Sequence, residues 1–239
     1  MSLIILDAGH CEYVAGKRNE KENFYEWEFN NDMQYKIKKR AEEHGITVYL
    51  TNPNPAKKDE IGLAKRANLA NDYWTKNSKP NAMFISLHGN AFSNQSARGT
   101  ETYVSLNAST KSKNFAKLVN DEIVSTMKSL DKNAKDRGVK SENFTVIYKA
   151  NMPSVLIEYG FYSNIDDLKI LKNNRDELVE ATIRAICKYF GVEYKPVQKT
   201  STGTQLYAVC VGAYNKANAD IMLKELKDKG YSSAYLIPR

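Results

Sequence analysis

Short apolar runs alternate along the chain with longer segments of helical periodicity. The runs are four or five residues long, which is typical of buried strands, and they are Leu3–Leu6, Ile46–Leu50 and Met83–Leu87. In the segments between and after them, apolar residues recur three or four positions apart, as in amphipathic helices. These predicted helices cover about 24–43, 59–76 and 110–130.

The alternation continues as far as Gly191, which is expected to end the last helix. Further strands are predicted at Thr100–Leu106, Phe144–Tyr148 and Val155–Ile157. Ser163 is the expected N-cap of the helical segment that follows, with Asp166 in a capping-box position. Strands that alternate with helices predict an α/β domain over residues 1–191, with a largely parallel sheet flanked by helices.

The pattern changes after residue 191. Residues 192–204 contain Pro196 and a Ser/Thr/Gly stretch, which predicts a flexible linker. Residues 205–239 then predict a small βαβ unit, composed of strand Leu206–Val211, helix 215–229 and strand Tyr231–Ile237. A unit of this size buries too little apolar surface to be stable alone, so we expect it to pack on the first domain or on a second copy.

Two of the apolar runs lead into a histidine. His10 follows the first run by a short turn, and His88 directly follows the third. Because ligands bind at the carboxyl ends of parallel strands, the two imidazoles are candidates for one metal site. A hydrolytic zinc site adds a carboxylate, and the candidates are Glu26, Glu28 and Glu158. The third histidine, His44, lies at a predicted helix end, where we expect it to be exposed and without a role.

Composition narrows the class of protein. The 239 residues are 42% hydrophobic and 26% charged, as in soluble globular proteins, and no apolar run is long enough to insert into a membrane. The net charge of +7 favours anionic partners such as wall polymers, but the basic residues are scattered, so no nucleic-acid partner is expected. The three cysteines form no CxxC motif, which argues against a thiolate zinc site.

The first predicted strand begins at residue 3, which leaves no room for a signal peptide. We therefore expect a protein made in the cytoplasm. Action outside the cell then requires release by another route, either a holin-type pore or lysis of the mother cell.

Several sequence blocks together resemble one enzyme family. The blocks occur in the family's order over residues 2 to about 190, and they are similar to those of the zinc-dependent N-acetylmuramoyl-L-alanine amidases, the third amidase family. The main blocks are Ile5–His10, Glu26 with Asn30, Phe84–Ala91 and Pro153–Asn164. Gly99–Tyr103 and Arg137–Lys140 match two further blocks.

This resemblance implies a specific site and reaction. His10, Glu26 and His88 would bind one zinc ion, and Glu158 would be the catalytic carboxylate. The substrate would be bacterial peptidoglycan, cut between N-acetylmuramic acid and L-alanine of the stem peptide, and the fold would contain a mixed sheet. Asn90 and Arg137 are candidates for orienting the glycan or the peptide.

Two further features bear on this expectation. Cys11 stands where the family commonly has glycine, so the adjoining loop departs from the family's pattern in this chain. The segment between His88 and Glu158 leaves little room for a self-blocking insert, so we expect an open site.

The C-terminal residues 205–239 resemble one half of a SPOR-type peptidoglycan-binding repeat. Such a half-repeat would bind the wall alone or pair in a homodimer. The residues leave two other functions open, a zinc peptidase that cuts within the stem peptide and a wall-binding protein without catalysis. Both a phage endolysin and a mother-cell autolysin suit this layout, and we favour the endolysin.

Overall fold

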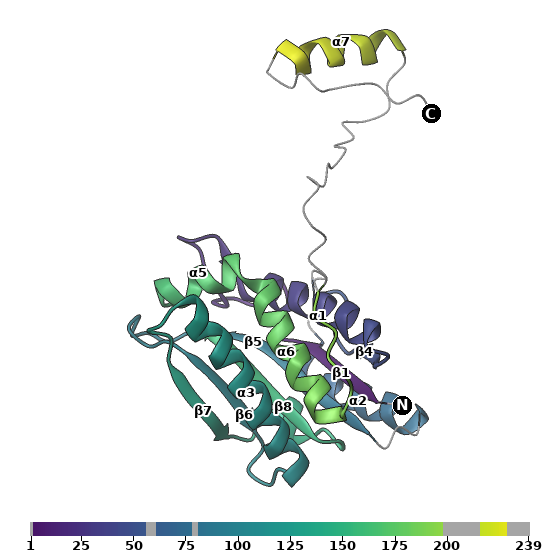
Figure 1. Ribbon diagram of the computed structural model, residues 1–239, viewed down its shortest axis with the longest axis vertical. Coiled ribbons are helices and arrows are strands. Elements are labelled where there is room, and N and C mark those ends of the chain that lie inside the picture. Colours follow the sequence, from purple (N-terminus) through teal and green to yellow (C-terminus); the bar gives the residue numbers. More distant parts are fainter. Residues whose placement is uncertain (1, 56–60, 78–80, 198–215, 229–239) are drawn as a thin grey trace. The chain divides into compact units, whose positions relative to one another are not determined.

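The structure is a computed structural model that describes residues 2–55, 61–77, 81–197 and 216–228. It divides into two compact units, Met1–Pro196 and Val197–Arg239 (Figure 1). The first unit contains the candidate site.

A six-stranded sheet forms the centre of the first unit, in the order β4-β1-β5-β8-β6-β7. All neighbouring strands are parallel except β6 and β8, which are antiparallel, so the predicted mixed and largely parallel sheet is confirmed. In sheet order the strands are Thr47–Leu50, Leu3–Ala8, Ala82–Asn90, Ser154–Phe161, Thr100–Val104 and Asp136–Ser141. A separate hairpin pairs β2 (Arg18–Asn19) with β3 (Phe24–Tyr25).

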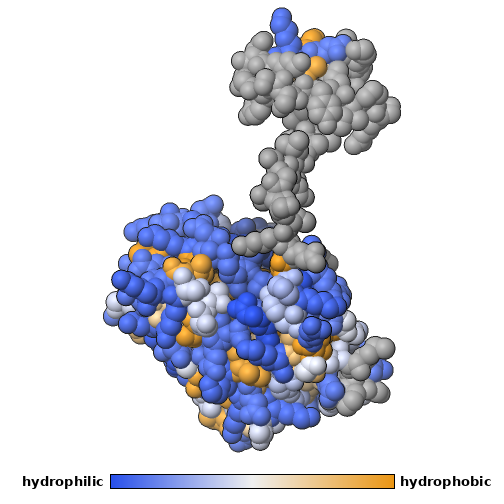
Figure 2. All heavy atoms as spheres, in the orientation of Figure 1, coloured by the Kyte–Doolittle hydropathy of each residue, from blue (hydrophilic) through white to orange (hydrophobic). Residues whose placement is uncertain are grey.

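Helices cover the two faces of the sheet unequally. The larger core lies under four helices, and alternate strand residues such as Ile4, Ile85 and Ile157 point into it. These helices are α1 (Glu26–Glu43), α3 (Thr110–Leu130), α5 (Ile165–Asn173) and α6 (Arg175–Phe190). In Figure 1, α3 and α6 run side by side across the sheet, and Figure 2 shows that this side of the unit is mostly hydrophilic.

The opposite face has a smaller core beneath α2 (Leu63–Asn77) and α4 (Thr145–Tyr148). Phe84 of β5 and Leu156 of β8 point into this core. Farther along these two strands on the same face, the residues are polar, namely His88 on β5 and Glu158 on β8. The candidate site lies at that carboxyl end of the sheet.

Two local predictions were wrong, and one strand was not predicted. Residues 145–148 form helix α4, although the sequence Thr-Val-Ile-Tyr favours a strand. Strand propensity depends on context, and here the packing of Val146 and Ile147 in the smaller core outweighs it. Strand β7 was not predicted, since its polar sequence lies at the largely exposed edge of the sheet. Asn164, not Ser163, caps α5, and its side chain accepts hydrogen bonds from the amides of Asp166 and Asp167.

His44 is also not the exposed residue that we expected, since it is buried at the end of α1. Its Nδ1 donates to the carbonyl of Arg40 at 2.7 Å, and its Nε2 accepts from the amide of Lys195 at 2.9 Å. Its ring stacks on Tyr194. The start of the predicted linker is therefore fastened to α1 of the first unit.

In the second unit, helix α7 (Lys216–Asp228) matches the predicted helix 215–229. The predicted strands Leu206–Val211 and Tyr231–Ile237 lie outside the described residues. Across the described part of the chain, no helix combines the length and apolar character needed to cross a membrane.

Candidate metal centre

His10, Glu26 and His88 converge at one end of the sheet. One ligand atom from each lies within 4.8 Å of the others. His10 Nε2 is 3.3 Å and His88 Nδ1 is 3.0 Å from the same carboxylate oxygen, Oε1 of Glu26. Two imidazole nitrogens and one carboxylate are the donor set of many hydrolytic zinc sites, so these residues fit the metal that the sequence predicted.

The turn after β1 places the first imidazole. His10 has a φ of 63°, a left-handed conformation that is uncommon for a residue with a side chain. Gly9 leaves room for the second imidazole, because a Cβ built there would lie 2.1 Å from Cε1 of His88. Glycine at position 9 is therefore a steric requirement of the His10–His88 contact.

Buried amides hold this turn in place. Asn30 on α1 donates to the carbonyl of Gly9 at 3.0 Å. Asn52 donates to the carbonyls of Ala8 and His10 at 2.9 and 3.1 Å. Sequence reasoning noted Asn30 only as part of a block and gave Asn52 no role, because the partners are backbone atoms distant in sequence.

Glu26 begins α1 and is buried, whereas the other carboxylate candidate in this turn, Glu28, is exposed. Burial alone would raise the pKa of Glu26, but hydrogen bonds from His10 and His88 outweigh it and lower the pKa to about 2. The carboxylate is therefore ionised, as a metal ligand must be.

Glu158, on β8, lies beside the His-Glu-His group. It is the register partner of His88 on β5, and β8 continues past it to Phe161 rather than ending at Ile157. Its Oε2 is buried and has no hydrogen-bond partner among the described residues. Burial, with the negative charges of Glu26 and Glu101, raises the pKa of Glu158 well above its usual range.

Glu101 on β6 is the other register partner of Glu158, and it binds four side chains. Its Oε1 accepts from Asn90 Nδ2 at 2.6 Å and from the Tyr103 hydroxyl at 3.0 Å. Its Oε2 accepts from Arg137 Nε at 2.7 Å and from Lys140 Nζ. The two candidate substrate residues, Asn90 and Arg137, are thus brought together by a carboxylate for which the sequence suggested no role.

Cys11 is buried and free, and it is not one of the three residues that converge in the described structure. Its side chain therefore adds no ligand to the His-Glu-His group.

Comparison with known proteins finds similarity in both sequence and fold. The profile of the N-acetylmuramoyl-L-alanine amidase family matches residues 4–188. The sporulation-specific N-acetylmuramoyl-L-alanine amidase of Bacillus subtilis is 25% identical over 82% of this chain and 69% of its own length. The endolysin of Bacillus phage SPP1 is 25% identical over 94% of this chain and 84% of its own.

Among solved structures, the N-acetylmuramoyl-L-alanine amidase of Clostridium difficile 630 superposes with a TM-score of 0.69. It is 29% identical, over 80% of this chain and 97% of that one. The chain spans only 35% of the length of a further relative that is 27% identical. The similarity is thus concentrated in the first unit, where the His-Glu-His group lies.

Proposed function

Because the chain belongs to the N-acetylmuramoyl-L-alanine amidase family, we propose that it is a zinc-dependent hydrolase of bacterial peptidoglycan. The bond cut is the amide between the lactyl group of N-acetylmuramic acid and L-alanine of the stem peptide. The observation that carries the proposal is the convergence of His10, Glu26 and His88 beside the unpaired carboxyl oxygen of Glu158. The first three residues hold the zinc ion in this proposal.

His10, Glu26 and His88 would hold the zinc ion, which would supply Lewis acidity to lower the pKa of a water molecule and to polarise the scissile carbonyl group. Glu158 supplies the proton transfers. It accepts a proton from the attacking water on Oε2 and gives a proton to the departing nitrogen of L-alanine, so that an acid and an amine result. The raised pKa suits both transfers, because it makes the carboxylate of Glu158 a stronger base than an ordinary glutamate and lets it hold the proton until the amine departs.

The variant Glu158→Gln tests this assignment. We expect it to keep one zinc per chain and to lose at least about 10²-fold in turnover, because the amide cannot accept the proton. Glu28→Gln, which changes an exposed carboxylate, is the matched control and should retain activity. An active Glu158→Gln enzyme contradicts the role of Glu158. Full activity of the wild type after chelation contradicts the zinc requirement.

Product analysis separates the amidase from its alternatives. An amidase releases amino groups on L-alanine and leaves intact lactyl groups, whereas a zinc peptidase exposes amines within the stem peptide. A wall-binding protein without catalysis releases neither product. Mass spectrometry of digested walls therefore distinguishes the three.

The proposal extends to residues 205–239 of the second unit as a SPOR-like unit, which binds the wall alone or pairs two chains in a homodimer. The match to the phage endolysin covers more of the chain than the amidase segment, so part of the second unit is also similar to an endolysin. Release to the wall then follows opening of a holin-type pore, or lysis of the mother cell.

Removal of residues 205–239 tests the role of the second unit. We expect weaker retention on purified walls and a smaller sedimenting species, with cleavage of soluble fragments unchanged. If added salt weakens the retention of the full chain, anionic wall polymers contribute to binding. Unchanged retention contradicts the wall-binding role.

A further inference from the structure

A bulge in strand β7 places two cations on one face of the sheet. Residues three apart in a regular strand point to opposite faces. In β7, however, Thr100 and Glu101 of β6 pair with Asp136 and Gly138, which leaves Arg137 as an extra residue. Arg137 and Lys140 therefore both reach Oε2 of Glu101.

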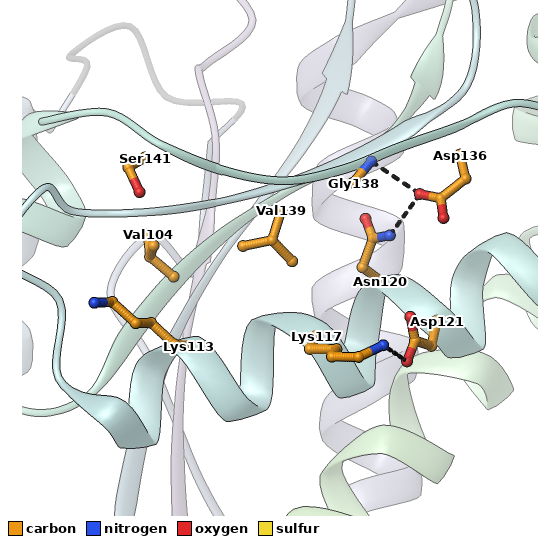
Figure 3. Close-up of a pocket in the computed structure, with 9 residues that line it drawn as sticks. All are labelled: Val104, Lys113, Lys117, Asn120, Asp121, Asp136, Gly138, Val139 and Ser141. Carbon is orange, nitrogen blue, oxygen red and sulfur yellow. Dashed lines mark hydrogen bonds and ion pairs between the residues drawn. The ribbon is translucent and has the colours of Figure 1, made fainter.

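The bulge is fastened from the other face of the sheet. Figure 3 shows that Oδ1 of Asp136 accepts from the Gly138 amide and from the side chain of Asn120 on α3, at 2.8 and 2.9 Å. Gly138 has a φ of 76°, which suits glycine. These contacts border a hollow between α3 and β7, and they fix the backbone from which Arg137 projects.

The charges of this cluster do not cancel. Glu101 contributes one negative charge, whereas Arg137 and Lys140 contribute two positive charges, and about a third of each cationic side chain is exposed, 34% and 37%. Among the described contacts, Arg137 uses only Nε for hydrogen bonding, and its guanidinium lies over the ring of Phe161. Its terminal nitrogens are thus available for a planar, two-pronged contact with a carboxylate.

The cluster lies on the same row of strand residues as His88 and Glu158. His88, Glu158, Glu101 and Gly138 are successive register partners on four neighbouring strands. Neighbouring strands are about 4.8 Å apart, so Glu101 is about 10 Å from the strand of His88. An extended peptide covers this distance in about three residues.

We propose that Arg137 and Lys140, held by Glu101, form a subsite that binds a free carboxylate on the second or third residue of the stem peptide. The inference rests on the proposed amidase function and names the feature of the peptide that this part of the site recognises. Arg137 contacts the carboxylate, Lys140 adds charge, and Asp136 acts as a positioning residue through the bulge.

The test uses pairs of soluble muropeptides that differ only in whether one carboxyl group of the second or third residue is free or amidated. Wild-type enzyme should cut the free acid with a KM about tenfold lower, since a hydrogen bond to a charged group is lost with the amide. The kcat values should be similar. Arg137→Gln should raise the KM for the acid alone and so remove the preference, and Arg137→Lys should restore part of it.

Lys117→Gln is the control for charge, because Lys117 lies on α3, on the other face of the sheet, and pairs with the exposed Asp121. It should leave the preference for the acid intact. Asp136→Ala should weaken that preference while kcat changes little, which a purely structural defect would not produce.

Equal KM values of the wild type for the acid and the amide overturn the inference. An Arg137→Gln variant whose KM rises by the same factor for both substrates also overturns it. If Arg137→Gln loses activity only on intact walls, and not on muropeptides, Arg137 and Lys140 bind wall polymers instead, which contradicts the inference. Failure of the proposed function is distinct, because wild type then releases no new L-alanine amine from either substrate.

Discussion

Glu101 and Glu158 face each other as direct partners across the antiparallel strands β6 and β8, yet their surroundings are opposite. Burial would raise the pKa of Glu101, but Lys140, Arg137 and Tyr103 outweigh it and lower that pKa. Burial and the neighbouring carboxylates raise the pKa of Glu158. Two carboxyl groups in direct register thus have pKa values shifted in opposite directions, and in the proposed reaction only Glu158 carries the proton.

Gly9→Ala should reduce zinc binding. The added methyl group would overlap the His88 imidazole at 2.1 Å, so the ring must move away from His10 and Glu26. We expect less than one zinc per chain after dialysis, measured by atomic absorption, and a matching loss of activity. Gly62→Ala is the control, since a Cβ at position 62 meets no atom within 4 Å. Full zinc content in Gly9→Ala would show that the His88 ring does not need this space.

Asn52→Ala should weaken both metal affinity and the fold. Its side chain binds the carbonyls on either side of Gly9, and the variant leaves the His10 carbonyl without that donor. We expect zinc affinity to fall about tenfold or more, as for other residues that support metal ligands. The cost in stability is about 1–3 kcal/mol by urea denaturation.

Asn71→Ala is the control for this variant. Asn71 also bridges backbone groups, those of Lys149 and Asn151, but these lie away from the metal group. Zinc affinity should be unchanged in this variant. Equal losses of affinity in both variants would mean that the Asn52 effect is a general loss of stability.

Asp167→Ala should destabilise the fold more than any change at the surface. The carboxylate is fully buried, accepts from the amides of Gly99 and Phe161 at 2.6 and 3.0 Å, and pairs with Arg98 at 3.1 Å. Removing it leaves two amides and a cation without this partner, at a cost of about 3–5 kcal/mol. Thermal unfolding measures the loss. Asp166→Ala, which removes the exposed neighbour that also pairs with Arg98, should cost far less.

Glu180→Gln should make stability less dependent on pH. Burial would raise the pKa of Glu180, but hydrogen bonds from Arg40 and Tyr194 outweigh it and lower that pKa. A folded-state pKa below the unfolded value of about 4.3 adds stability above pH 4.3, which is lost as pH falls through the folded value. The variant should therefore be about 1–2 kcal/mol less stable than wild type at pH 7, and nearly equal to it at low pH.

Urea denaturation at several pH values measures this difference. Glu177→Gln, an exposed change on the same helix, is the control and should follow the wild type throughout. A gap for Glu180→Gln that stays constant or widens as pH falls contradicts the assigned sign.

The sequence predicted most of the elements that position the His-Glu-His group. Buried strands were recognisable because uninterrupted runs of Ile, Leu and Phe seldom occur in exposed segments, and helix α3 was found with its observed limits. The pairing of His10 with His88 followed from two parallel strands that end at one edge. Both inferences use local pattern together with a rule that holds for all parallel sheets.

What the sequence did not predict depends on contacts between distant residues. Strand β7 is polar because its neighbours are solvent and Glu101, so it lacks the alternation of a half-buried strand. The role of Glu101 needs the register of three strands, and that of Asn52 needs the path of the backbone around His10. None of these relationships leaves a periodic signal along the chain.

The row of His88, Glu158 and Glu101 lies on strands, whereas a separate hollow is lined by loop residues such as Gly16, Lys21 and Gln95. These three side chains and the residues that line the hollow are therefore carried by different parts of the backbone. A sequence change in those loops would therefore alter the hollow while the strands that carry His88, Glu158 and Glu101 keep their register.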